Sequence, residues 1–209
     1  MFQFVRHGAA AAALAVIASA PVAAQAPHDY VQADVDFMQG MIWHHAQAVS
    51  MCLLAGSHGA SEKVAELCHK IILSQEDEIG LMQNWLADRG RNVPHPRTDT
   101  MVFHEPASAS AMPAMAGMAA GESHMMPGML NHAQMLALDS ARGTAWDRAF
   151  LVGMMQHHGG AITMVTKLFD TGGAGQQAEL FRFATGVDAD QRGEINRMQI
   201  MLNSLPGGE

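Results

Sequence analysis

Residues 37–51 read FMQGMIWHHAQAVSM, and residues 150–164 read FLVGMMQHHGGAITM. Both stretches place Phe, Met, His, Ala and Met at successive steps of four, three, four and three residues, which is the spacing of side chains along one face of an α-helix. Such a face normally holds only apolar residues, but here a histidine lies one turn after a methionine in both copies. We therefore expect two related helices that each bury a histidine.

Helical periodicity continues on either side of these two stretches, and no strand pattern competes with it. Short turns rich in glycine separate the helices within each half of the chain. We predict an all-α fold, a four-helix bundle built from two duplicated antiparallel hairpins, residues 25–90 and 136–209. The expected helices cover residues 34–55, 61–88, 144–169 and 176–205, with a short additional helix over 131–138.

The beginning of the chain has the composition of a signal peptide. Arg6 precedes an apolar run over residues 8–18, and Val22-Ala23-Ala24 provides small residues for cleavage. We predict that residues 1–24 are removed, that the mature protein is periplasmic or secreted, and that it has no membrane span. The net charge of −8 argues against nucleic acid as a partner and suits cation binding.

Residues 91–135 differ from the rest of the chain, because proline, methionine and histidine are frequent there and apolar periodicity is weak. Closely spaced methionines among Pro, Gly and Ala fill no core, so we predict a flexible linker that collects a soft cation such as Cu(I). A plain spacer of biased composition is the alternative. The candidate linker ligands are Met112, Met115, Met118, His124, Met125, Met126 and Met129.

Imidazole and thioether on one helix face form the ligand set of copper. We predict two copper sites, one in each repeat, with His44 and His157 as the central ligands and the adjacent histidines as auxiliary ligands. A buried histidine that only forms hydrogen bonds is the alternative. The candidate metal ligands are Met41, His44, His45, Met51, Met154, His157, His158 and Met164.

The second helix of each hairpin carries polar residues on its otherwise apolar face, at Gln75 and Glu78 and again at Gln191 and Glu194. A buried carboxylate is costly unless it has a partner. Counting from the turn places Gln75 opposite His44 and Glu78 opposite Met41. We expect these side chains to orient the histidines, as hydrogen-bond partners of metal ligands do.

The chain has two cysteines, Cys52 and Cys68, which we place on consecutive helices. In an oxidising compartment a disulfide is the ordinary interpretation. A soft metal ligand is the alternative. The second hairpin has Val165 and Ala184 at the matching positions, so the cysteines are not part of the repeated pattern.

The pattern Met-x-x-His-His-x5-Met, followed on the next helix by Ser/Asp-Gln-x-x-Glu-Ile-x-x-Met, resembles the family catalogued as domain of unknown function 305. That family includes periplasmic copper-binding proteins of the CopM type. The resemblance implies a ferritin-like helical fold, copper binding, and a role in copper tolerance alongside other periplasmic copper-handling proteins. The matching residues on the second helices are Ser74, Gln75, Glu78, Ile79 and Met82, and Asp190, Gln191, Glu194, Ile195 and Met198.

We therefore expect an exported protein that sequesters or shuttles copper, as Cu(I) and also as Cu(II), and that is not an enzyme. A helical metal oxidase acting on Cu(I) or Fe(II) and a metal-free structural domain are the alternatives. A symmetric di-iron site is disfavoured. The Glu66-x-x-His69 pattern that such a site needs has Arg182 and Thr185 at the matching positions.

Overall fold

The computed structural model describes residues 29–99 and 126–207. These residues form five helices and no strand, which confirms the prediction of an all-helical chain. The predicted signal peptide lies outside the described residues, and so do most of the candidate linker ligands, namely Met112, Met115, Met118, His124 and Met125.

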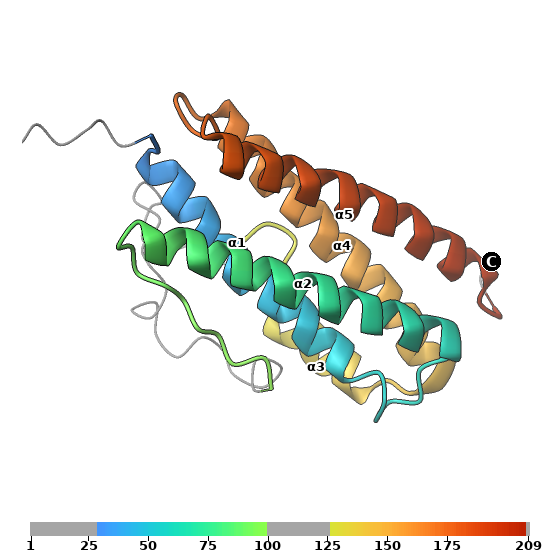
Figure 1. Ribbon diagram of the computed structural model, residues 1–209. Coiled ribbons are helices and arrows are strands. Elements are labelled where there is room, and N and C mark those ends of the chain that lie inside the picture. The colour runs from blue at the N-terminus through green and yellow to red at the C-terminus, as the bar shows by residue number, and fades with distance from the viewer. Residues whose placement is uncertain (1–28, 100–125, 208–209) are drawn as a thin grey trace, which may run out of the picture.

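Each helix begins and ends close to the expected residues. Within each half of the chain the second long helix runs back along the first, so α1 packs on α2 and α4 packs on α5 (Figure 1). The halves meet where α1 packs against α4, and the short α3 lies beside α4. Among the described residues, no helix combines the length and the apolar character that a membrane span requires. The helices are α1 Gln32–Leu53, α2 Glu62–Asp88, α3 His132–Ser140, α4 Gly143–Asp170 and α5 Ala178–Ser204.

Two aspartates at matching positions of the repeat connect the halves. Asp34 of α1 accepts a hydrogen bond from the backbone nitrogen of Gly175, in the turn between α4 and α5, at 2.7 Å. Asp147 of α4 accepts one from the backbone nitrogen of Ser61, at the start of α2, at 3.1 Å. Both carboxylates are buried. Each therefore satisfies a turn donor that would otherwise lack a partner.

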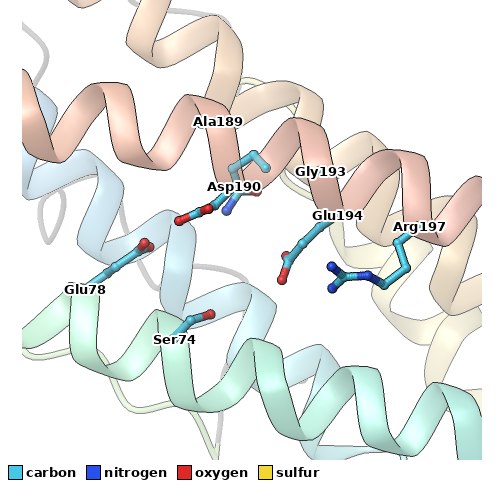
Figure 2. Close-up of a pocket in the computed structure, with 8 residues that line it drawn as sticks. Ser74, Glu78, Ala189, Asp190, Gly193, Glu194 and Arg197 are labelled. Carbon is cyan, nitrogen blue, oxygen red and sulfur yellow. The ribbon is translucent and has the colours of Figure 1, made fainter.

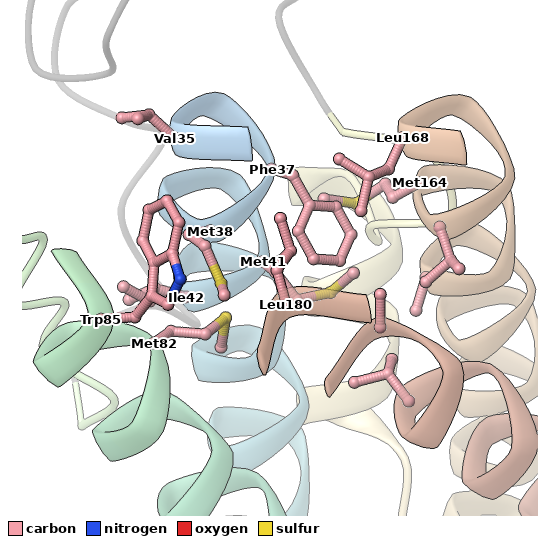
Figure 3. Packing of buried hydrophobic residues seen from close by; sticks show 14 of the residues in the cluster. Val35, Phe37, Met38, Met41, Ile42, Met82, Trp85, Met164, Leu168 and Leu180 are labelled. Atoms are coloured by element: carbon pink, nitrogen blue, oxygen red, sulfur yellow. The ribbon is translucent and has the colours of Figure 1, made fainter. Parts of the chain in front are cut away.

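The apolar core is divided into two clusters with a polar layer between them. One cluster holds Phe37 and Met41 of α1 with Leu168 of α4 (Figure 3). The other holds Trp146 and Phe150 of α4 with residues from the far end of α1. Along every long helix the residues of one cluster precede the polar positions and those of the other follow them. The histidines therefore lie in the middle of the protein.

The described ends of the predicted linker are packed onto the helices rather than free. Near its beginning, the amide of Gln39 donates to the carbonyl oxygen of Asn92 at 2.7 Å. Near its end, Met126 and Leu130 are buried, and α3 begins at His132, inside the range predicted to be linker. The apolar residues just before α3 are therefore covered by α1 and α4, and α3 corresponds to the short helix expected over residues 131–138.

Candidate metal centre

The four repeated histidines meet in the polar layer. The rings of His44 on α1 and His157 on α4 lie against each other, with 3.8 Å between their centroids. The ring of His45 lies 6.4 Å from that of His44, and the ring of His158 lies 6.2 Å from that of His157. All four side chains are fully buried. The sequence led us to expect two separate sites, but the contact between α1 and α4 brings the two histidine pairs into a single cluster.

The glutamates hold the second histidine of each pair, not the first. The Nε2 atom of His45 lies 2.6 Å from Oε2 of Glu78, and Nε2 of His158 lies 2.6 Å from Oε2 of Glu194. The glutamates expected to orient the histidines therefore lie against His45 and His158, one position after His44 and His157. Successive helix residues point about 100° apart, so His45 faces α2 while His44 faces α4.

The two glutamines do not make the expected hydrogen bonds to the histidines. Gln75 and Gln191 are both buried. The amide oxygen of each has no hydrogen-bond partner among the described residues. Both glutamines lie in the polar layer with the histidines, and their two amide oxygens are additional buried acceptors without a partner among the described residues.

The histidine rings have more buried nitrogens than the protein has partners for. The Nδ1 atoms of all four rings lack a partner within the described part of the chain, and so does Nε2 of His157. The Nε2 atom of His44 donates to the carbonyl oxygen of Pro127 at 3.0 Å. A buried polar group without a partner costs about 1–3 kcal/mol. When Nε2 carries the proton, Nδ1 presents a lone pair that can bind a metal.

Burial keeps the two central imidazoles uncharged. Burial is the main cause that lowers the pKa of His44 to about 3, and the neighbouring His45 acts in the same direction. Burial also lowers the pKa of His157 well below its usual value, with His44 and His158 adding to the effect. Metal ions bind the neutral form of histidine. Both rings are therefore in the ligand form at neutral pH without having to release a proton.

Thioether side chains lie on both sides of the histidine contact. Met41, Met51 and Met154 are fully buried, and Met164 is nearly so. The glycine before the first methionine of each repeat makes room for a methionine of the other helix. A Cβ atom on Gly40 would lie 3.4 Å from Cε of Met164, and a Cβ on Gly153 would lie 3.5 Å from Cε of Met51.

Within residues 29–99 and 126–207, no three His, Cys, Asp or Glu side chains are arranged so that they could hold a metal ion by themselves. A metal in this layer would need the sulfur of methionine beside the imidazole nitrogens. Thioether sulfur selects soft ions such as Cu(I), and imidazole serves both Cu(I) and Cu(II). The donors present fit copper better than a hard ion such as Mg²⁺.

Residues 126–130, which we call the strap, cover the histidine contact, and we did not expect them there from the sequence. Both ends of the Gln47 amide hold Leu130, accepting from its nitrogen at 2.8 Å and donating to its oxygen at 2.9 Å. The carbonyl oxygen of Pro127 lies over Gly160 of α4. The only sequence signal was the change from Ala46-Gln47 in the first repeat to Gly159-Gly160 in the second.

We expect Gly160→Ala to displace the strap and to lower the free energy of unfolding. The added Cβ would overlap the carbonyl oxygen of Pro127, which is backbone and cannot rotate away, and such overpacking costs about 1–3 kcal/mol. Gly159→Ala is the matched control. Nothing lies within 4 Å of its Cβ position, so the better helix propensity of alanine stabilises by up to about 1 kcal/mol. Urea unfolding of both variants measures this, and equal effects would contradict the role of the strap.

Cys52 and Cys68 are free, buried thiols in the structure, so the predicted disulfide is not formed there. Burial raises the pKa of the Cys52 thiol, and the contact with the Cys68 thiol raises it further. The two cysteines pack in one apolar cluster, as their counterparts Val165 and Ala184 do in the other. Both buried side chains serve as small apolar groups in the core.

A cleft of about 280 Å³ lies between α2 and α5 and leads to the outer side of the polar layer (Figure 2). Glu78 and Glu194 line it, so the carboxylates that hold the buried His45 and His158 also reach solvent, with 19% and 16% of their side chains exposed. The other polar residues of the cleft are Ser74, Asp190, Gln191 and Arg197.

Comparisons with known proteins show related folds. The crystal structure of a DUF305 fragment from Deinococcus radiodurans matches with a TM-score of 0.65 and 27% identity, over 84% of this chain and 99% of that one. A DUF305 protein from Streptomyces coelicolor, predicted to be secreted, matches with a TM-score of 0.65 and 26% identity, over 83% and 93%. CopM in its Cu(II)-bound form matches with a TM-score of 0.58 and 26% identity, over 81% and 95%.

None of the functionally curated proteins matches the sequence. The model of the domain of unknown function DUF305 matches residues 34–202, which include all five helices apart from the first residues of α1 and the last of α5. This chain therefore belongs to the DUF305 family.

Proposed function

We propose that this protein binds copper at the histidine cluster and sequesters or shuttles it outside the cytoplasm, and that it is not an enzyme. The observation that carries the proposal is the contact between His44 and His157. These are two neutral, fully buried imidazoles, one with both ring nitrogens unpaired, and buried thioethers lie on either side. A protein that bound nothing there would gain stability from apolar residues in their place.

The proposed site is one shared centre. His44 and His157 would supply nitrogen. Met41 and Met154, each one helical turn before its histidine, would supply sulfur. Met51 and Met164, which each face a glycine of the opposite helix, would supply sulfur as well. His45 and His158 would act as auxiliary ligands whose orientation Glu78 and Glu194 fix. A bound copper ion would accept lone pairs from the buried sulfur atoms and from the ring nitrogens, several of which otherwise have no partner among the described residues. The match to Cu(II)-bound CopM at 26% identity supports the choice of copper.

Three broader features belong to the same proposal. The chain would form a ferritin-like four-helix bundle from two duplicated hairpins, which the recurrence of the Asp34 contact at Asp147 supports. It would be exported to the periplasm or secreted, which the composition of residues 1–24 supports. Its partners would be other copper-handling proteins, and the cleft beside Glu78 and Glu194 would be the route for the ion.

An anaerobic Cu(I) titration of the mature chain, beginning at Gln25, against a chromogenic chelator tests the proposal. We expect the protein to compete for copper, and the double variant His44→Leu/His157→Leu to lose the copper held by the helices while it keeps copper held by the linker. His69→Ala, an exposed histidine of α2, is the control and should behave as the natural protein does.

The same samples separate the alternatives. Unchanged stoichiometry in the double variant would refute the histidine site. Dioxygen consumption with turnover of Cu(I) or Fe(II) would favour an oxidase. A protein whose melting temperature no metal changes, and which does not compete for copper in either oxidation state, would be a structural domain.

A further inference from the structure

The contact between α1 and α4 has two ends that match in their glycines and methionines. Gly40 lies four residues before His44, and it faces Met164, which lies seven residues after His157. Gly153 lies four residues before His157, and it faces Met51, which lies seven residues after His44. The distances from the two Cβ positions to the methionine methyl groups are 3.4 and 3.5 Å. Each end of the histidine contact therefore has one thioether over a glycine.

The strap makes these two ends chemically different. At the first end, the sulfur of Met126 lies 3.2 Å from the Cβ position of Gly40. At the second end, the corresponding space over Gly153 is filled by Leu130, with Cδ2 at 3.0 Å. Two thioethers, those of Met126 and Met164, therefore share the space over Gly40, whereas one thioether and one hydrocarbon side chain share the space over Gly153.

Packing alone does not explain the methionine. Methionine is a common filler of irregular core space, but Leu130 fills the equivalent space at the other end of the same contact, so a hydrocarbon side chain suffices there. Met126 is buried. Its position is fixed because the next residue, Pro127, accepts the hydrogen bond of His44, and because Gln47 holds Leu130 further along the strap. The sulfur is thus held close to the histidine cluster by a segment of defined conformation.

We propose that Met126 and Met164 form a thioether site over Gly40 that takes a soft monovalent cation, Cu(I) or Ag(I), and that the Gly153 end has no equivalent site. Met41, the residue after Gly40, is fully buried in the same apolar cluster (Figure 3). The two ends of the centre then differ in the oxidation state of copper that they bind more tightly. The Gly40 end favours the reduced ion, because thioethers select Cu(I), and the imidazoles alone accept either oxidation state. This inference rests on the proposed copper-binding function.

The chain supplies its own matched variants for the test. Met126→Leu gives the Gly40 end the side chain found at the other end, and Leu130→Met gives the Gly153 end a second thioether. Each variant and the natural full mature chain are titrated anaerobically with Cu(I) and with Ag(I), a soft ion that does not change oxidation state, and separately with Cu(II). X-ray absorption of the Ag(I) forms counts the sulfur ligands.

We expect Met126→Leu to weaken the tightest Ag(I) and Cu(I) binding by about tenfold or more, the loss typical when a metal site is deprived of one supporting group. It should also remove sulfur from the Ag(I) coordination shell and leave Cu(II) binding unchanged. Leu130→Met should add sulfur ligation and strengthen the binding of soft ions. Far-ultraviolet circular dichroism checks that both variants keep their helices.

The outcomes separate this inference from the proposed function. If the natural chain binds copper through His44 and His157 but Met126→Leu keeps its Ag(I) affinity and sulfur count, Met126 is only a packing residue and the inference is wrong. The inference is also wrong if Cu(II) binding by Met126→Leu falls as much as Cu(I) binding does. If the natural chain binds neither Ag(I) nor copper, the inference and the proposed function fail together.

Discussion

His157→Leu is expected to stabilise the metal-free protein while it abolishes copper binding at the proposed centre. His157 is fully buried, and neither of its ring nitrogens has a partner among the described residues. Leucine has a similar volume and leaves no polar atom to be satisfied. Removing buried polar groups that have no partner gains about 1–3 kcal/mol in the free energy of unfolding. Urea unfolding at pH 8 with a chelator present measures the gain, and the Cu(I) titration measures the loss of binding.

The adjacent histidine provides the control. His158→Leu is equally buried but leaves the carboxylate of Glu194 without its partner. We therefore expect this variant to destabilise the metal-free protein by about 1–3 kcal/mol. If the two substitutions change the free energy of unfolding in opposite directions, His158 has a partner within the protein and His157 has none in the metal-free state. Destabilisation of similar size by both variants would mean that His157 is an ordinary core residue.

Acidification is expected to destabilise the metal-free protein steeply below pH 6.5. In the unfolded chain His44 has a pKa of about 6.5, whereas burial lowers it to about 3 in the folded protein. Between these values the unfolded state binds a proton that the folded state does not bind, so the free energy of unfolding rises with pH and falls on acidification. The fall is about 1.4 kcal/mol per pH unit for each such group, and the lowered pKa of His157 acts in the same direction.

Urea unfolding between pH 7.5 and pH 5 checks this dependence. Above pH 5 most unfolded-state carboxylates are already ionised, so the histidines dominate the slope. The double variant His44→Leu/His157→Leu should show a much shallower dependence than the natural chain. An identical slope in the two proteins would mean that the central imidazoles take up protons in the folded state as readily as in the unfolded one.

The helices could be predicted from the sequence because their signals are local. The steps of four and three residues around His44 and His157 fix both the helical period and the face that is buried. The contact between the two histidines could not be predicted in the same way. It depends on how α1 crosses α4, and the repeat is equally compatible with two distant sites.

Which histidine Glu78 contacts could not be predicted, for a related reason. Counting from a turn gives the height of a residue along a helix but not the direction in which its side chain points. A difference of one residue, from His44 to His45, turns the side chain from α4 toward α2. The position of the strap was not predicted because its composition is that of a linker. It can lie close to α4 because Gly160 has no side chain at the point of contact.

The hydrogen bonds of Asp34 and Asp147 to turns of the opposite halves affect how the chain folds. Each aspartate completes a bend that belongs to the opposite half, so neither half contains all the partners that its own backbone requires. A nascent chain that has only its first hairpin outside the ribosome would leave the backbone N–H of Ser61 without Asp147 and His44 without the contact to His157. The two halves therefore complete each other's turns, and the four histidines come together only when α1 and α4 have packed against each other.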